Sequence, residues 1–162
     1  MRSLLRPKSA RGFTMVELMI VVGIMGVIIS IAVPGYQRLT ARAYRTELNG
    51  IFSKARMYFI NQYENTGSFP LPASGTDSTW NPIDPAASPP PGTPVKWVTD
   101  GDWKEMPGAD GSVRMRYLYR VTNSGTTLQL LAQGQFPGLG AYSYSETYDG
   151  TVQTGTAEIP QF

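Results

Sequence analysis

One carboxylate stands alone in a long apolar stretch near the start of the chain. From Phe13 to Val33 the only ionisable side chain is that of Glu17. An ionised carboxylate inside a membrane helix costs about 2.5 to 3.5 kcal/mol on insertion scales, so such residues are rarely kept without a partner or a role. Glu17 is therefore a candidate functional residue that favours a cationic partner. The alternative is that Glu17 lies near the membrane surface, where its carboxylate reaches water and needs no partner.

The stretch that carries Glu17 is long enough to cross a membrane. Its 21 residues from Phe13 to Val33 extend for roughly 30 Å as an α-helix, which matches the hydrocarbon core of a bilayer. We therefore expect a transmembrane helix over residues 13–35. Pro34 lacks an amide hydrogen and crowds the preceding turn, so the helix should kink or loosen between Gly26 and Gly35.

A basic leader, residues 1–12, precedes the apolar stretch. Its charged residues are all basic: Arg2, Arg6, Lys8 and Arg11. A secretory signal also begins with basic residues, and the small residues Ser30 and Ala32 make cleavage after Ala32 the alternative interpretation. Against this alternative, the apolar run is longer than the core of a typical signal peptide.

These features together resemble the precursors of the type IV pilin and pseudopilin family. The resemblance is carried by the leader that ends in Gly12, the following Phe13, Glu17 four residues later in an apolar helix, and Pro34 near the end of that helix. It is strong over residues 6 to about 60. It implies that a dedicated prepilin peptidase cleaves after Gly12 and that the new N-terminus, Phe13, becomes methylated. Glycine at the cleavage position has no side chain that would hinder close approach of a peptidase.

The resemblance also implies how the subunit assembles. Glu17 would meet the Phe13 amine of a neighbouring subunit, and residues 26–34 would unwind in the filament, with Gly26 and Pro34 as the residues that permit it. The implied partners are copies of the chain or other pilins in a helical filament, the prepilin peptidase, an inner-membrane assembly platform, and the lipid bilayer before assembly.

The implied localisation is a single-pass inner-membrane precursor with a cytoplasmic N-terminus, which then enters a cell-surface pilus or a periplasmic pseudopilus. Charge alone gives little support for this orientation. Basic residues follow the apolar stretch at Arg38, Arg42 and Arg45 as well as preceding it, so the positive-inside bias is small.

Composition excludes several kinds of chemistry. Cysteine and histidine are absent, which rules out thiol nucleophiles, Ser-His-Asp triads and the usual zinc sites. We expect no catalytic residue, no cofactor and no metal. Several pseudopilins bind calcium in a late loop, but residues 134–140 contain no carboxylate, and calcium prefers oxygen ligands that include carboxylates. Without cysteine, the loop that many pilins close with a disulfide needs another restraint.

The charge balance does not suggest nucleic acid. The leader holds four of the 14 basic residues and none of the 12 acidic ones, so the side chains of the remainder carry a net charge of −2. A row of basic residues, Arg114, Arg116 and Arg120, alternates with apolar ones. DNA phosphates are one possible contact for this row, but we expect a solvated or subunit-contacting face, because no aromatic platform accompanies it.

The sequence predicts an α+β fold in which a long kinked helix packs on a C-terminal antiparallel meander. The globular domain spans residues 36–162, with a helix over 36–65, a proline-rich loop over 66–112 and a sheet over 113–155. Apolar residues recur in the helix at steps of three and four: Tyr36, Leu39, Tyr44, Leu48, Ile51, Phe52, Ala55 and Phe59. The loop holds Trp80, Trp97 and Trp103, whose burial would drape it over the domain instead of leaving a free linker.

The expected function is that of a structural, non-enzymatic subunit of a bacterial type IV pilus filament. Within the same family, the alternatives are a pseudopilin of a type II secretion system and a minor pilin that primes the filament. A membrane-anchored or exported monomeric binding domain is the alternative from another class.

Overall fold

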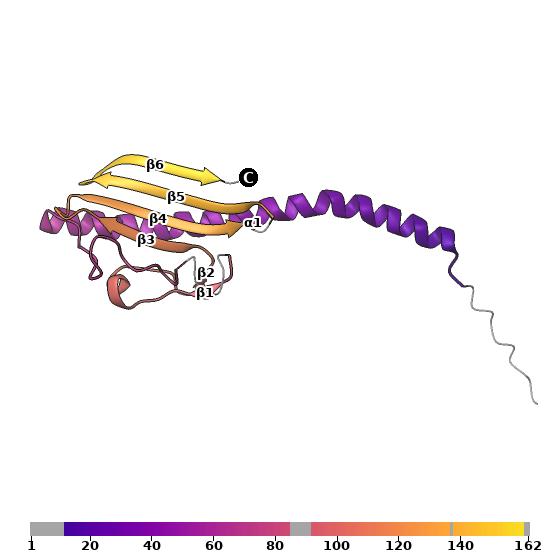
Figure 1. Ribbon diagram of the computed structural model, residues 1–162, viewed down its shortest axis with the longest axis horizontal. Coiled ribbons are helices and arrows are strands. Elements are labelled where there is room, and N and C mark those ends of the chain that lie inside the picture. The colour runs from indigo at the N-terminus through magenta and orange to yellow at the C-terminus, as the bar shows by residue number, and fades with distance from the viewer. Residues whose placement is uncertain (1–11, 85–91, 137, 161–162) are drawn as a thin grey trace, which may run out of the picture. The chain divides into compact units, whose positions relative to one another are not determined.

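The computed structural model describes residues 12–84, 92–136 and 138–160; the leader residues 1–11 and the prolines 89–91 lie outside this range. The chain divides into two compact units, unit 1 from Met1 to Tyr36 and unit 2 from Gln37 to Phe162. A single α-helix, α1 (Met15–Thr66), is followed by short strands, a 3-10 turn and a four-stranded antiparallel sheet (Figure 1). The α+β class predicted from the sequence is confirmed.

The helical part of unit 1 is apolar and open to its surroundings. Every large hydrophobic side chain from Phe13 to Val33 is at least 41% exposed. An 18-residue window here has a mean hydropathy of 2.7, and none of it is buried. By length and composition this segment can cross a membrane. The helix continues without interruption through Pro34, so unwinding of residues 26–34 in a filament stays a prediction.

In unit 2 the second half of α1 packs on the sheet through one face. Its buried residues follow helical spacing: Ala41, Tyr44, Leu48, Ile51, Phe52, Ala55 and Phe59. The predicted stripe is right from Tyr44 onward and wrong at Tyr36 and Leu39, which are 69% and 63% exposed. Leu39 falls off the stripe because it lies five residues before Tyr44, about 140° around the helix. Tyr36 continues the four-residue step through Thr40, but it belongs to unit 1 and is exposed.

The sheet is an antiparallel meander in the order β3-β4-β5-β6. Its strands are β3 (Arg116–Val121), β4 (Thr127–Phe136), β5 (Gly140–Asp149) and β6 (Val152–Pro160). Aromatic rings join the helix to the sheet, with Phe59 4.8 Å from Tyr119 and Phe52 6.2 Å from Tyr117 between ring centroids. The sheet extends beyond its predicted end at residue 155, because β6 pairs with β5 as far as Pro160.

The expected basic face before and along β3 is only partly solvated, because Arg114 and Arg120 are exposed whereas Arg116 is not. Arg116 is fully buried, and its guanidinium donates hydrogen bonds to the carbonyls of Arg114 and Met115 at 3.2 and 3.4 Å. It also lies 3.5 Å from the carbonyl of Thr93, in the segment that crosses this end of β3. The strand pattern could not reveal this cover, because the covering segment is remote in sequence. Arg120 is exposed but pairs with Asp77.

The proline-rich loop packs on the domain. It contains β1 (Val95–Lys96), the 3-10 turn η1 (Gly101–Trp103) and β2 (Ser112–Val113), which pairs with β1. The expectation of a draped loop is confirmed by Trp97 and Trp103, which are 4% and 3% exposed. The paired strands β1 and β2 were not expected from the sequence.

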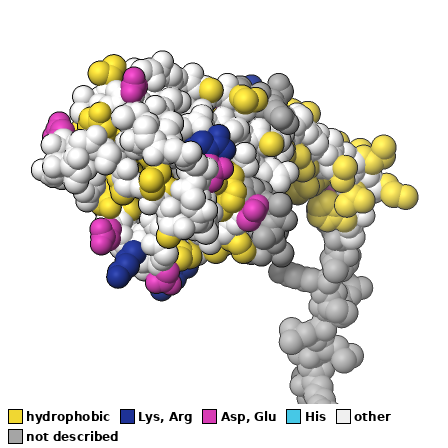
Figure 2. Space-filling view, turned by 60° about the vertical axis from the view of Figure 1, so that its left-hand side comes forward, with side chains coloured by type: hydrophobic (Ala, Val, Ile, Leu, Met, Phe, Trp, Pro, Cys, Tyr) yellow, Lys and Arg dark blue, Asp and Glu magenta, His cyan; other side chains and the backbone are white. Residues whose placement is uncertain are grey.

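Two polar side chains restrain this loop in a chain without cysteine. The buried amide of Asn81 donates to the carbonyl of Val98 at 2.7 Å and accepts from the Val98 amide at 3.0 Å. The carboxylate of Asp102 accepts from the amides of Ala73 and Thr79 at 2.7 and 2.8 Å, and from the Ser74 hydroxyl at 2.6 Å. These bonds tie distant parts of the loop together. Figure 2 shows a surface on which charged side chains are scattered among polar and hydrophobic ones.

Candidate processing and assembly site

Glu17 closes a hydrogen-bonded ring with Thr14 at the start of α1. The Glu17 amide donates to the Thr14 hydroxyl oxygen at 3.2 Å, while the Thr14 amide and hydroxyl donate to Oε2 of Glu17 at 2.9 and 2.8 Å. The carbonyl of Thr14 accepts from the Leu18 amide at 3.2 Å. This reciprocal arrangement is a capping box, in which an N-cap Thr and a Glu three residues later satisfy each other's backbone amides.

The capping box gives Glu17 a local role that our reading of the sequence missed. The signal was available, because a Ser or Thr followed three residues later by an acidic residue, just before an apolar run, marks a helix start. In the described residues, Oε2 of Glu17 accepts the bonds from Thr14, and no hydrogen bond is formed by its other carboxylate oxygen, Oε1. The carboxylate can therefore cap its own helix and still accept a bond from a cation.

The peptide bond proposed for cleavage is accessible. Gly12 and Phe13 are exposed, and the Phe13 side chain is 78% exposed. A β-carbon at Gly12 would meet no atom within 4 Å. The helix begins only at Met15, so the Gly12–Phe13 bond lies in non-helical chain, which a peptidase can bind in extended form.

The other predicted assembly residues are spread along the same helix. Gly26 has no atom within 4 Å of a β-carbon built on it, so its flank is open to another helix. Pro34 lies inside α1, 17 residues beyond Glu17 and therefore about 26 Å along the axis. The structure does not gather Glu17, Gly26 and Pro34 into one pocket. They form a line along an exposed apolar helix.

A second polar cluster joins the helix to the sheet. Glu146 on β5 is only 5% exposed, and both its oxygens accept from the Arg56 guanidinium, at 3.0 and 2.8 Å. The hydroxyls of Tyr144 and Tyr148 donate to the same carboxylate. Burial and the bond to Glu146 raise the pKa of Tyr144 to about 12. Glu146 is thus committed to Arg56.

In the three described segments, no group of three or more His, Cys, Asp or Glu side chains could hold a metal ion. Two carboxylates follow the loop of residues 134–140. Glu146 binds Arg56, whereas Asp149 lies at the end of β5. Neither has the neighbouring carboxylates that calcium favours.

Comparison with known proteins finds similarity in part of the chain. Residues 7–33 match the model of the prokaryotic N-terminal methylation motif. A type IV major pilin protein of Neisseria gonorrhoeae is 38% identical over 60 residues, which cover 37% of this chain and 36% of that protein. The fimbrial protein EcpC of Eikenella corrodens is 34% identical over 73 residues, 44% of this chain and 48% of that protein.

A fimbrial protein of Pseudomonas aeruginosa is 54% identical over 39 residues, 24% of this chain and 25% of that protein. The chain spans about a third of the length of the Neisseria relatives that it matches. No solved structure matches it. The segment that carries Gly12, Phe13 and Glu17 thus lies within the prokaryotic N-terminal methylation motif, and the relatives similar to part of this chain are type IV pilins and fimbrial proteins.

Proposed function

We propose that the chain is the precursor of a structural subunit of a bacterial type IV pilus filament. A prepilin peptidase cleaves it after Gly12, and the new N-terminus at Phe13 is methylated. Before assembly the subunit resides in the inner membrane with its N-terminus in the cytoplasm. An assembly platform then moves it into a filament of its own copies or other pilins. The role is structural and involves no catalysis.

The observation that carries this proposal is the apolar first part of α1, which is exposed up to Val33 and lies within the methylation motif. Its side chains from Phe13 to Val33 have no cover within the described residues, and burying such a surface in lipid or against other copies is strongly favourable. The relatives named above are major pilins and fimbrial proteins, which favours a pilus subunit over a pseudopilin.

Assembly would use the free oxygen of Glu17. Cleavage creates a cationic amine at Phe13, two residues ahead of the helix that Glu17 caps. Unlike charges at about 4 Å attract by roughly 4 kcal/mol where the effective dielectric constant is near 20. The Phe13 amine of an incoming subunit would therefore dock at Glu17 of its neighbour, with the closely packed helices excluding water.

The test compares Glu17→Ala with Thr14→Ala. Glu17→Ala removes the carboxylate, so it should insert into the membrane at least as well as the wild type but yield at least tenfold fewer filaments. Thr14→Ala weakens the same capping box by about 1 kcal/mol and leaves the carboxylate in place, so it should assemble nearly normally. Membrane fractionation measures insertion, and recovery of sheared filaments measures assembly. Equal yields from Glu17→Ala and the wild type would refute the docking role.

A further inference from the structure

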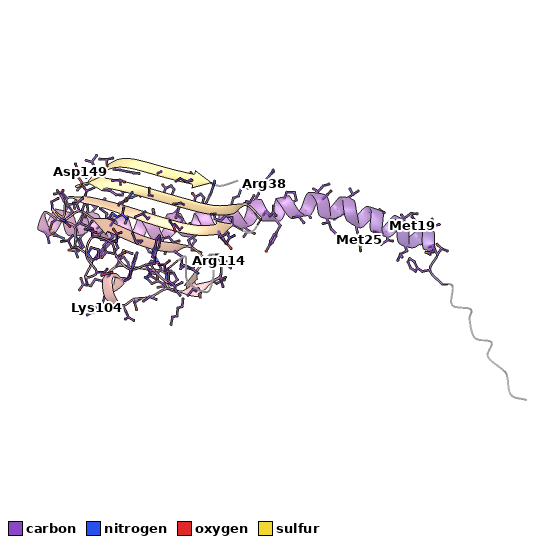
Figure 3. The ribbon with its side chains drawn as sticks, in the orientation of Figure 1. Met19, Met25, Arg38, Lys104, Arg114 and Asp149 are labelled. Atoms are coloured by element: carbon purple, nitrogen blue, oxygen red, sulfur yellow. The ribbon has the colours of Figure 1, made fainter. Side chains whose placement is uncertain are left out.

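Unit 2 has a basic groove beside its first residues, just after the apolar part of α1. Five residues line a groove of about 280 Å³: Arg38, Ala41, Arg42, Arg45 and Leu139. Three of these residues are arginines, and the other two, Ala41 and Leu139, give the groove an apolar part that is continuous with the core. Figure 3 shows Arg38 at one end of unit 2 and Asp149 at the opposite end.

The charges of the groove are largely uncompensated. Arg45 pairs with Glu158 at 3.1 Å and lies over the ring of Tyr142. Arg38 and Arg42 are exposed, and their guanidinium groups have no hydrogen-bond or ion-pair partner within residues 12–84, 92–136 and 138–160. The groove therefore presents two unpaired cations, one turn apart on the helix, beside an apolar surface.

The far wall of the groove is held close to the helix. It belongs to the β4–β5 turn, where Gly138 has φ +72° and a β-carbon would fall 2.0 Å from the side-chain nitrogen of Gln37. The positive φ favours glycine at this position. The close approach of Gly138 to Gln37 keeps Leu139 beside Arg42. The groove is therefore formed by packed parts of unit 2.

Chain connectivity limits where this groove can lie. Arg38 follows Val33, the last residue of the apolar stretch, by five positions, so their Cα atoms are at most about 18 Å apart in any conformation and about 7.5 Å apart along a helix. If the apolar stretch spans a membrane, Arg38 must lie in or beside the headgroup layer. The exposed Leu39, 63% accessible between the two arginines, suits that layer, where apolar side chains partly enter the lipid.

We propose that the Arg38–Arg42 groove binds the phosphate of an anionic phospholipid headgroup in the membrane that the precursor spans. Guanidinium groups form bidentate bonds to phosphate oxygens, and basic residues near a membrane surface each contribute about 1 kcal/mol of attraction to anionic lipid. Ala41 and Leu139 would contact the glycerol and upper acyl region. The proposal rests on the membrane-resident precursor of the proposed function and would fix the depth of unit 2 until the subunit leaves the bilayer.

The experiment uses the full-length chain in a neutral detergent. Phosphatidylglycerol or phosphatidylcholine with the same acyl chains is added, and bound lipid is counted by native mass spectrometry. The wild type should prefer phosphatidylglycerol. Arg38→Gln with Arg42→Gln should weaken its binding about tenfold or more, whereas the control pair Lys96→Gln with Lys104→Gln, which removes the same charge from exposed positions outside the groove, should not.

Two further arms separate the lipid from other ligands and from failure of the filament proposal. Millimolar glycerol phosphate should not displace the lipid; displacement would assign the groove to free phosphate and overturn the proposal. Glu17→Ala should keep the lipid preference while losing filaments, so the two proposals fail separately. Four results would each overturn the lipid site. The wild type could show no preference for the anionic lipid, or the double variant could bind this lipid as well as the wild type does. A short oligonucleotide could bind more tightly than the lipid, or filament assembly could be lost without any lipid preference.

Discussion

At the scale of single residues, the polar side chains of unit 2 act by satisfying one another where the fold buries them. Glu146 illustrates this, because a carboxylate that is 5% exposed is tolerated only when its oxygens are paired and hydrogen-bonded. Arg56, Tyr144 and Tyr148 provide those partners. The cluster fixes the rotation of the helix against β5.

We predict that Arg56→Met destabilises the fold by about 2 to 3 kcal/mol, because it leaves a buried carboxylate without its cation. Urea unfolding of the full-length chain in detergent, followed by tryptophan fluorescence, measures this loss. Arg42→Met is the matched control, since its guanidinium is exposed and should change stability by less than about 0.5 kcal/mol. Equal effects of the two variants would show that the Arg56–Glu146 pair contributes nothing specific.

Residue-scale features were only partly predictable. Glu17 was identified from its charge in an apolar setting, and its bond to Thr14 could have been read from the Thr-x-x-Glu spacing. The burial of Arg116 could not be predicted, because alternation along a strand shows which side chains share a face but not whether a remote segment covers that face. Its burial depends on the segment around Thr93, and no local pattern encodes that contact.

At the scale of elements, the loop between helix and sheet is held by polar contacts in place of a covalent link. Asp102 is its main acidic acceptor. Burial of this carboxylate raises its pKa, but hydrogen bonds from Ser74, Thr79 and Ala73 outweigh burial, and the net pKa of Asp102 lies below its usual value. A lowered pKa means that the folded state favours the ionised form.

The expected consequence is a loss of stability in acid. Because the folded pKa is lower than the unfolded value of about 3.9, the contribution of Asp102 is present above that value and disappears as the pH falls through the folded pKa. Urea unfolding between pH 5 and pH 2.5 should show a smaller acid loss in Asp102→Asn than in the wild type. The exposed neighbour Asp100 supplies the control, and an Asp100→Asn variant that flattens the curve equally would contradict the assignment.

Features of the elements could be predicted from the sequence where local spacing determines them. The helical stripe from Tyr44 to Phe59 was predicted, since the apolar period is a local signal. Leu39 was assigned to the stripe wrongly, because five residues before Tyr44 is the wrong side of the helix. Tyr36 has the right spacing but lies in unit 1, where it is exposed. The pairing of β1 with β2 joins Val95 to Val113, a contact between residues too far apart for a short pattern to reveal.

At the scale of the whole molecule, the surfaces of the two units suit different surroundings. Unit 1 exposes apolar side chains that suit lipid or other helices, while unit 2 has its own core of helix, loop and sheet. We predict that residues 36–162 form a soluble monomer that needs neither metal nor disulfide. Sedimentation and thermal melting of this fragment, with and without a chelator, measure this; a lower melting temperature in chelator would reveal a bound ion.

The central claim is that the precursor is processed between Gly12 and Phe13. Mass spectrometry of the mature protein purified from its own host measures the N-terminus directly. We predict a chain that begins at Phe13 and carries a methyl group on its α-amine, with Glu17 intact in the retained helix. A mature chain that begins at Val33 would mean that the apolar stretch is a removed signal, and it would contradict both the processing and the assembly proposed for this protein.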